Sequence, residues 1–152
     1  NEANKAREYG VRVVNLRTGF VIGKGGALAK MTTPFKLFLG GPVGSGKQYL
    51  SWIHIDDHVG ITLLALQNPQ ISGPINLTAL YPVTNEEFSS LLGQVLRRPS
   101  WLRVPAFALK LLFGEGAQML LEGQRVIPKK ALDYGYKFKF ANLEAALQDV
   151  LA

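Results

Sequence analysis

The chain has 152 residues, of which 47% are hydrophobic, and a formal net charge of +6. This length and composition predict a globular protein with an apolar core, and no apolar run approaches the roughly 20 residues that a membrane-spanning helix needs. Cysteine is absent, which excludes disulfides and thiolate metal sites and favours a cytoplasmic location.

The charge is unevenly placed along the sequence. No Asp or Glu occurs in residues 9–55 or in residues 88–114, whereas both intervals contain several Lys and Arg residues. A field of one sign near a cleft concentrates anionic ligands, and the alternative is a solvated basic surface. The basic residues are not clustered with stacking aromatic residues, so we expect no nucleic-acid partner. Without an apolar span we expect no membrane partner either.

The first part of the chain has the pattern of a parallel α/β protein. Residues 1–9 have the pattern of the end of a helix that stops at Gly10, and we expect further residues before them in the complete protein. The mostly apolar segment Val11–Leu16 predicts a parallel strand that is buried on both faces. Residues 17–19 follow at the carboxyl end of this strand, where ligands bind in such sheets.

A glycine-rich stretch, residues 40–48, separates a predicted helix from a predicted strand. Residues 27–39 have apolar residues at helical spacing despite Pro34. Residues 49–55 are rich in aromatic and β-branched residues, as extended segments are. The stretch therefore predicts a loop that opens a strand.

That loop matches the phosphate-binding pattern G-x-x-x-x-G-K over residues 41–47. Gln48 follows, however, where Ser or Thr would bind magnesium. A phosphate loop also follows a strand and opens a helix, so that helix N–H groups face the anion. The order here is reversed, and we interpret the match as accidental.

A helix over residues 57–68 follows the strand, and Asp56 or Asp57 can cap it. A metal site built from His54, Asp56, Asp57 and His58 is an alternative. Strand alternation followed by a helix cap would scatter these side chains, and capping explains the two carboxylates. We therefore expect no metal.

The second half of the chain is mainly helical by pattern. Pro74–Leu77 predicts a short strand, and Thr84 with Glu87 forms a capping box for a helix that ends before Pro99. Four further elements are predicted: helices over residues 105–113 and 117–121, a half-exposed strand over residues 136–140, and a final helix from Asn142.

Several motifs resemble a known family. Residues 16–23 (LRTGFVIG), 44–48 (GSGKQ) and 51–57 (SWIHIDD) resemble the second half of an extended short-chain dehydrogenase/reductase. More narrowly, they resemble the atypical branch described as NAD(P)-dependent and sugar-nucleotide-epimerase-like. Residues 73–77 (GPINL) continue the match, and residues 120–128 (LLEGQRVIP) are similar to the small C-terminal domain of that branch. The resemblance covers essentially the whole chain.

The resemblance implies an α/β fold in two parts. Residues 1–78 would be the end of a Rossmann-type NAD(P)-binding domain with a substrate-side insert, and residues 79–152 a small, mainly helical C-terminal domain on the substrate side. The complete protein would transfer hydride between NADP(H), with NAD as the alternative, and a small carbonyl or alcohol substrate.

The resemblance also implies that the reactive groups lie elsewhere. The glycine-rich turn that binds the pyrophosphate would precede Asn1, and the family's catalytic pair is a Tyr with a Lys four residues later. None of the five Tyr residues has a Lys at that spacing. We therefore expect no catalytic residue in this chain and no activity of the chain alone, and homo-oligomerisation is open.

By position, Arg17, Thr18 and Gly19 would lie beside the nicotinamide, with backbone groups on its carboxamide. Glycine would let the backbone approach the ring closely. A plain strand-to-loop turn is the equal alternative for Gly19, and an ion pair with an acidic residue is the alternative for Arg17.

Gln48, Trp52 and His54 would border the substrate pocket. A core aromatic is the favoured interpretation of Trp52, and a structural imidazole that of His54. Sugar-nucleotide members usually have an Arg where this chain has Leu50, and many have an Asn where it has Phe20. The sugar-nucleotide substrate therefore does not follow from the resemblance, because function belongs to the site. Two other functions stay open: a non-catalytic interaction module and a basic phosphate- or nucleic-acid-binding domain.

Overall fold

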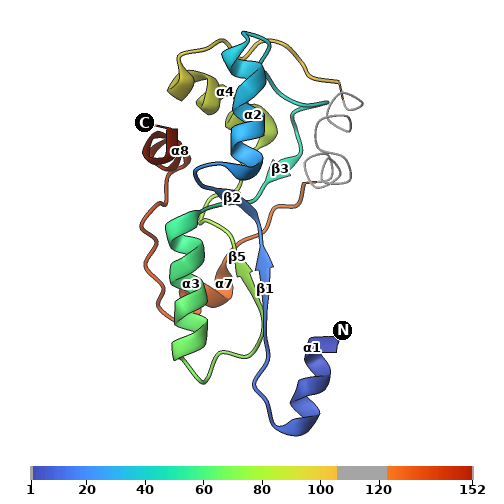
Figure 1. Ribbon diagram of the computed structural model, residues 1–152, viewed down its shortest axis with the longest axis vertical. Helices are drawn as coiled ribbons and strands as arrows, with labels where there is room; N and C mark the ends of the chain where they lie inside the picture. The colour runs from blue at the N-terminus through green and yellow to red at the C-terminus, as the bar shows by residue number, and fades with distance from the viewer. Residues whose placement is uncertain (1, 106–122, 152) are drawn as a thin grey trace.

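The computed structural model describes residues 2–105 and 123–151. They form an elongated molecule, with α1 (Glu2–Lys5) near one end and the helices α2 and α4 at the other (Figure 1). The first turn continues as the 3₁₀ helix η1 (Ala6–Tyr9) and stops at Gly10, whose φ of 74° is left-handed. The predicted helix end at Gly10 is confirmed.

The strands of the described residues form three pairs. Parallel pairing joins the first strand to the fifth and the second to the fourth, whereas the third and sixth are antiparallel. Their bounds are β1 (Val14–Thr18), β2 (Phe20–Ile22), β3 (Tyr49–Leu50), β4 (Trp52–His54), β5 (Gly73–Leu77) and β6 (Val83–Thr84). The parallel pairs together with the helices confirm the α/β fold class.

Strand β1 differs from its prediction in place and in burial. The predicted strand covered Val11–Leu16, whereas β1 begins at Val14 and ends at Thr18. Leu16 is 41% exposed, so the expectation of burial on both faces is wrong for this chain. The reason is that, among the described residues, β1 pairs with β5 alone and its other edge has no neighbouring strand.

The helices follow the apolar stripes of the sequence. Their bounds are α2 (Gly26–Lys36), α3 (Ile55–Gln67), α4 (Asn85–Leu96), α7 (Lys129–Asp133) and α8 (Leu143–Leu151). The capping box of α4 is confirmed, because the side chain of Thr84 accepts from the backbone N–H of Glu87 and the side chain of Glu87 accepts from that of Thr84. The final helix buries its apolar face, and the side chain of Asn142 accepts from the amide of Glu144.

The N-terminus of α3 differs from its prediction. The capping residue is His54, whose Nδ1 accepts from the amide of Asp56 at 3.2 Å. The prediction that Asp56 or Asp57 caps this helix is wrong, because both aspartates lie inside the first turn and face the C-terminal segment.

The strand predicted over residues 136–140 is also absent. The amides of Lys139 and Phe140 donate to the two carboxylate oxygens of Asp57, at 2.8 and 2.9 Å. Backbone donors that a strand would use in a ladder are thus bonded to a side chain, and the alternating pattern forms no strand.

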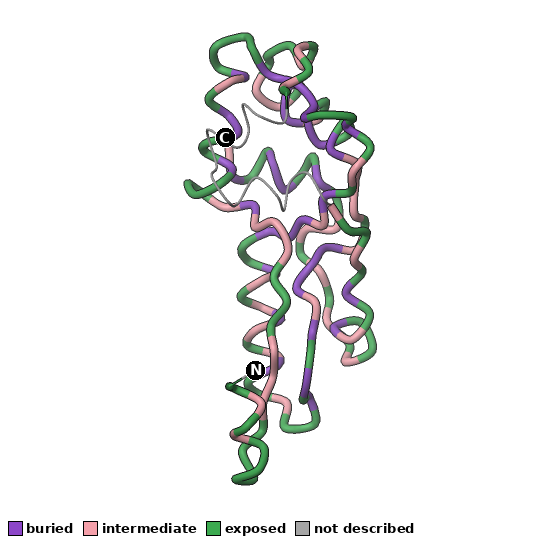
Figure 2. The backbone as a smooth tube through the Cα atoms, turned by 90° about the vertical axis from the view of Figure 1, so that its right-hand side faces the viewer, coloured by how far each residue is buried: buried purple, intermediate pink, exposed green. Residues whose placement is uncertain are grey.

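Two apolar clusters fill the interior. One lies under α2, α4 and α8 and includes Trp52, Phe88 and Leu147, and the other lies between α3 and β5 and includes Ile61 and Ile75. Figure 2 shows that buried residues are concentrated away from the N-terminal end. Both clusters draw residues from either side of residue 78, and the division into two domains stays a prediction.

The helix predicted over residues 117–121 lies outside the described residues, as does nearly all of the one predicted over residues 105–113. No described helix is both long and apolar enough to cross a membrane.

Candidate functional site

The carboxyl ends of β1 and β5 meet at Gly19. The amide of Gly19 donates to the carbonyl of Leu77 at 3.0 Å, and the next amide, of Phe20, donates to the carbonyl of Ser51 at 2.8 Å. A Cβ on Gly19 would lie 2.2 Å from that Ser51 oxygen, which is far inside van der Waals contact. Glycine is therefore needed here for packing, because the chain passes from β1 to β2 directly against another backbone.

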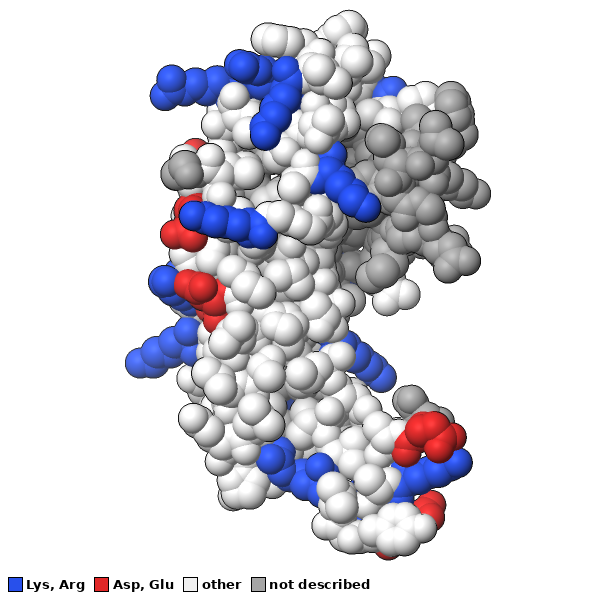
Figure 3. All heavy atoms as spheres, in the orientation of Figure 1, with Lys and Arg blue, Asp and Glu red and all other residues white. Residues whose placement is uncertain are grey.

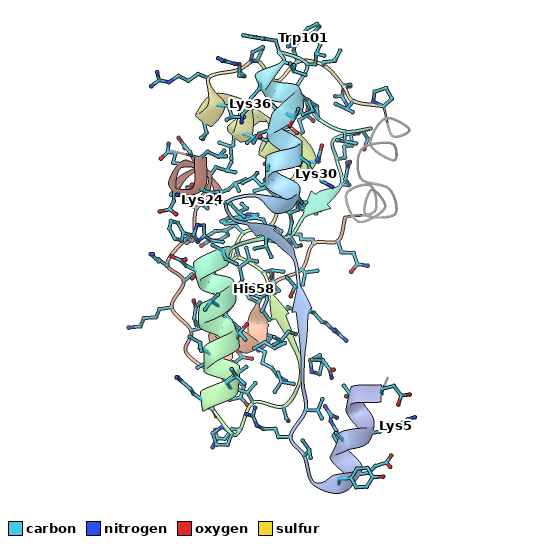
Figure 4. The ribbon with its side chains drawn as sticks, in the orientation of Figure 1. Lys5, Lys24, Lys30, Lys36, His58 and Trp101 are labelled. Atoms are coloured by element: carbon cyan, nitrogen blue, oxygen red, sulfur yellow. The ribbon has the colours of Figure 1, made fainter. Side chains whose placement is uncertain are left out.

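Thr18 is the exposed polar side chain of this strand end. Its hydroxyl lies 3.2 Å from Nε2 of His58, which belongs to the second turn of α3 and faces the β1–β2 junction (Figure 4). Partial burial lowers the pKa of His58 below its ordinary value, so the imidazole is neutral at neutral pH. A neutral imidazole has one N–H donor and one acceptor nitrogen. Depending on the tautomer, Nε2 of His58 therefore either donates to the Thr18 hydroxyl or accepts from it.

Arg17 lies on the wall of an open groove of about 560 Å³ between β5 and α7. Two lysines share this wall. Lys129 pairs with Asp133 at 2.8 Å, whereas Nζ of Lys130 donates to the carbonyl of Ser72. No ion pair of the described residues includes Arg17, so the groove carries a net positive charge. The remaining residues of the wall are Pro74, Asn76 and Tyr134.

The segment of residues 123–127 lies along the same strand ends. The hydroxyl of Ser51 donates to the carbonyl of Gln124 at 2.6 Å and accepts from the amide of Val126 at 3.0 Å. Thr78 and Asn76 donate to the carbonyls of Val126 and Ile127. Ser51 thus joins this segment to the β3–β4 junction and, through its own carbonyl, to Phe20 next to Gly19. The sequence motif of residues 120–128 gave no sign of these contacts.

Gln48 stabilises the glycine-rich loop from inside. Its side-chain nitrogen donates to the carbonyl of Val43 at 3.0 Å, and its oxygen accepts from the hydroxyl of Ser45 at 3.3 Å. The loop follows helix α2 and precedes strand β3. This order is the reverse of that in a phosphate loop, as predicted. Lys47 is exposed at this turn.

Trp52 and His54 are each only 1% exposed. The indole of Trp52 donates to the carbonyl of Tyr81 at 3.0 Å. The imidazole of His54 stacks on Phe140, with ring centres 3.8 Å apart, and its Nε2 lies 3.3 Å from a carboxylate oxygen of Asp149. Both side chains thus have internal contacts, which favours the structural interpretations, and a substrate-side position for them and for Gln48 stays a prediction.

Asp57 is the main polar residue whose role the sequence did not indicate. It is fully buried and accepts from the phenol of Tyr136 as well as from two backbone amides. Burial and this hydrogen bond raise the pKa of Tyr136 far above its ordinary value. Beside it, the hydrogen bond from the exposed ammonium of Lys139 lowers the pKa of the Asp56 carboxyl. His54, Asp56, Asp57 and His58 are engaged in separate contacts, and no group of three or more metal-ligating side chains occurs in the described ranges.

Comparison with known proteins identifies the family. The profile of the NAD dependent epimerase/dehydratase family matches residues 3–77, and a domain of unknown function, DUF1731, matches residues 104–150. An Arabidopsis thaliana protein named "Epimerase family protein SDR39U1 homolog, chloroplastic" is 52% identical over 93% of this chain and 41% of the relative. Epimerase family protein YfhF of Bacillus subtilis is 40% identical over 99% of this chain and 50% of the relative.

Solved structures agree with the sequence matches. The crystal structure of human epimerase family protein SDR39U1 with NADPH has a TM-score of 0.84 and 43% identity, covering 92% of this chain and 48% of that chain. Thermus thermophilus UDP-glucose 4-epimerase, with a TM-score of 0.73 at 17% identity, shares the fold. The chain spans about half the length of these relatives. It belongs to the NAD-dependent epimerase/dehydratase family of extended short-chain dehydrogenase/reductases, as its motifs indicated, and carries the DUF1731 domain in its C-terminal part.

Proposed function

We propose that this chain forms the nicotinamide-side and substrate-side wall of an NADPH-dependent oxidoreductase. The observation that carries the proposal is the strand end at residues 18–19, where β1 and β5 finish together and the Thr18 hydroxyl is exposed. Ligands bind outside the carboxyl ends of parallel strands in this class of fold. The similar human protein that was solved with NADPH supports NADP over NAD.

The geometry distinguishes between Thr18 and Gly19, two of the three residues expected at the nicotinamide. The amide of Gly19 is already bonded to Leu77, so it is not a free donor for a carboxamide. Thr18 has an exposed hydroxyl with a neutral imidazole behind it, and a hydroxyl can donate and accept. These groups fit a carboxamide, which also has one acceptor and one donor group. Thr18 is thus the polar contact that we propose for the cofactor, and Gly19 keeps the wall flat.

The bound cofactor would supply the hydride, and the chain's own residues would orient its ring and exclude water. We propose that the substrate is a small carbonyl or alcohol compound. Leu50 is buried, and Phe20 packs edge-to-face on Phe88 with ring centres 5.7 Å apart. Both side chains serve the core, so neither offers the polar contact that sugar-nucleotide members use at these positions.

The proposal is tested by titrating NADPH into the full-length protein that contains this chain. The Thr18→Val variant should bind NADPH roughly fivefold more weakly, since a hydrogen bond of this kind contributes about 1 kcal/mol. The conservative Thr18→Ser variant keeps the hydroxyl and should bind as the wild type does. Equal affinities for all three proteins would contradict the proposed contact.

The remaining expectations are part of the same proposal. The isolated chain should not transfer hydride, because it lacks the catalytic Tyr and Lys pair. It should not bind NADPH tightly either, because the pyrophosphate-binding turn that the resemblance implies is not among its residues. Tight binding of NADPH by the isolated chain would contradict this. The location in the cytoplasm, the homo-oligomer and the absence of a nucleic-acid partner also stay predictions, and the relative from Arabidopsis thaliana is named as chloroplastic.

A further inference from the structure

Two loops meet at the end of the molecule that is farthest from α1. Leu37–Leu39 follows α2, and Trp101 belongs to the segment after α4. The indole of Trp101 donates to the carbonyl of Phe38 at 3.2 Å, which holds the two loops together. Phe38 is 55% exposed and Trp101 is 67% exposed, and Leu37 and Leu39 are exposed as well. We call these four residues the apolar tip; Figure 4 labels Trp101 at its upper edge.

The backbone of Phe38 is in an unfavourable conformation. Its φ is 62°, in the left-handed region, which glycine normally occupies just after a helix end. The turn has the usual hydrogen bonds of such an end, from Phe38 to the carbonyl of Phe35 and from Leu39 to that of Pro34. An aromatic side chain gains little inside the fold when most of it faces water. Strain of this kind is characteristic of functional positions.

The surroundings of the apolar tip are basic. The guanidinium of Arg98 lies 4.8 Å from the ring centre of Phe38. In the sequence, Lys36 directly precedes Leu37 of the tip, and Arg97 directly precedes Arg98. None of these three cations takes part in an ion pair of the described residues, although Arg97 shares a groove with Glu144. Figure 3 shows blue side chains at this end and red ones lower down.

We propose that the apolar tip attaches the protein peripherally to the surface of an anionic lipid bilayer. Leu, Phe and Trp side chains enter the headgroup boundary, and Lys and Arg contact the anionic headgroups. The tip projects outward from two turns, which suits insertion into a soft layer. A second copy of the chain is disfavoured as the occupant, because its own cations would face these. The sequence led us to expect no membrane partner because no span is long enough, but peripheral attachment needs no span.

The experiment is co-sedimentation of the full-length protein with phosphatidylcholine vesicles that contain or lack phosphatidylglycerol. We expect binding to the anionic vesicles only, and loss of that binding at high salt. The fluorescence of Trp101, isolated as the difference between wild type and Trp101→Phe, should shift to shorter wavelength on binding. Absence of binding to anionic vesicles would overturn the proposal, and binding to polyglutamate without binding to vesicles would indicate an acidic protein partner instead.

Phe38→Gly separates a lipid contact from a structural role. Glycine relieves the left-handed strain, so the thermal midpoint should stay the same or rise, whereas vesicle binding should fall roughly tenfold with the loss of one large apolar side chain. Tyr81→Ser, which removes an aromatic residue outside the tip that is at least as exposed as Phe38, is the control and should bind as the wild type does. Unchanged vesicle binding by Phe38→Gly would contradict the proposal, even if the protein remains folded.

Discussion

The phenol of Tyr136 donates a hydrogen bond of 3.0 Å to the carboxylate of Asp57, which precedes it by 79 residues. The same carboxylate accepts from the amides of Lys139 and Phe140. Three donors therefore converge on one fully buried charge in the first turn of α3, where the helix dipole also favours a negative group. This contact attaches the C-terminal segment to the helix and determines its path toward α8.

Replacement of this carboxylate should be strongly destabilising. In Asp57→Asn, the side-chain NH₂ group would face a backbone donor, and one part-buried N–H would lose its acceptor. We expect a loss of roughly 2–4 kcal/mol in the free energy of unfolding, measured by urea denaturation of the full-length protein. Asp56→Asn is the matched control, because its exposed partner Lys139 contributes much less. Similar losses for both variants would contradict the role of Asp57.

The close approach at Gly19 gives a second prediction. In Gly19→Ala the new Cβ would meet the carbonyl oxygen of Ser51 at 2.2 Å, so the β1–β2 and β3–β4 junctions must separate locally. We expect a loss of roughly 1–3 kcal/mol in stability together with weaker NADPH binding. Gly23→Ala is the control, since its nearest neighbour, Ile55, lies at an ordinary 3.5 Å. A fully stable Gly19→Ala protein would show that the two backbones are not held at this distance.

The burial of His58 predicts a dependence of stability on pH. Its pKa is lowered from the ordinary 6.5, so below that pH the unfolded chain binds a proton that the folded protein does not. The contribution of the neutral imidazole is present above pH 6.5 and is lost as the pH falls below it. Thermal midpoints of wild type and His58→Gln should therefore converge or cross on acidification. Parallel curves for the two proteins between neutral and mildly acidic pH would be inconsistent with this.

The uncovered side of β1 predicts how the isolated chain behaves. Leu16 is partly exposed beside a strand edge that has no partner in the described residues, and α3 exposes Val59, Leu63 and Leu66 on one face. Exposed apolar stripes and free edges favour association. Light scattering should show oligomers or aggregates of the isolated chain, whereas a monodisperse monomer that unfolds cooperatively would contradict the prediction.

What the sequence predicted depends on the range of each interaction. The capping box of Thr84 and Glu87 and the stop at Gly10 involve neighbours in sequence, and both are confirmed. Asp57 was misassigned because its donors lie about eighty residues away. The same long-range bonds explain why the alternating pattern of residues 136–140 does not form a strand.

The candidate site shows the same difference between local and long-range interactions. Residues 17–19 were located at a strand end because the end of a strand has a local pattern, and the structure places them there. The packing of Gly19 against Ser51 and the contact between Thr18 and His58 bring together residues that are 32 and 40 positions apart. No local signal specifies such pairs, so the sequence could suggest a ligand wall but not which of its groups are free.

His54 is both the last residue of β4 and the capping residue of α3. Strand and helix therefore meet at one residue with no linker between them. A change in the angle between β4 and α3 would break the hydrogen bond from the Asp56 amide to the His54 imidazole, so bending at this junction is disfavoured. The imidazole thus limits where the protein can flex without itself having to touch a substrate.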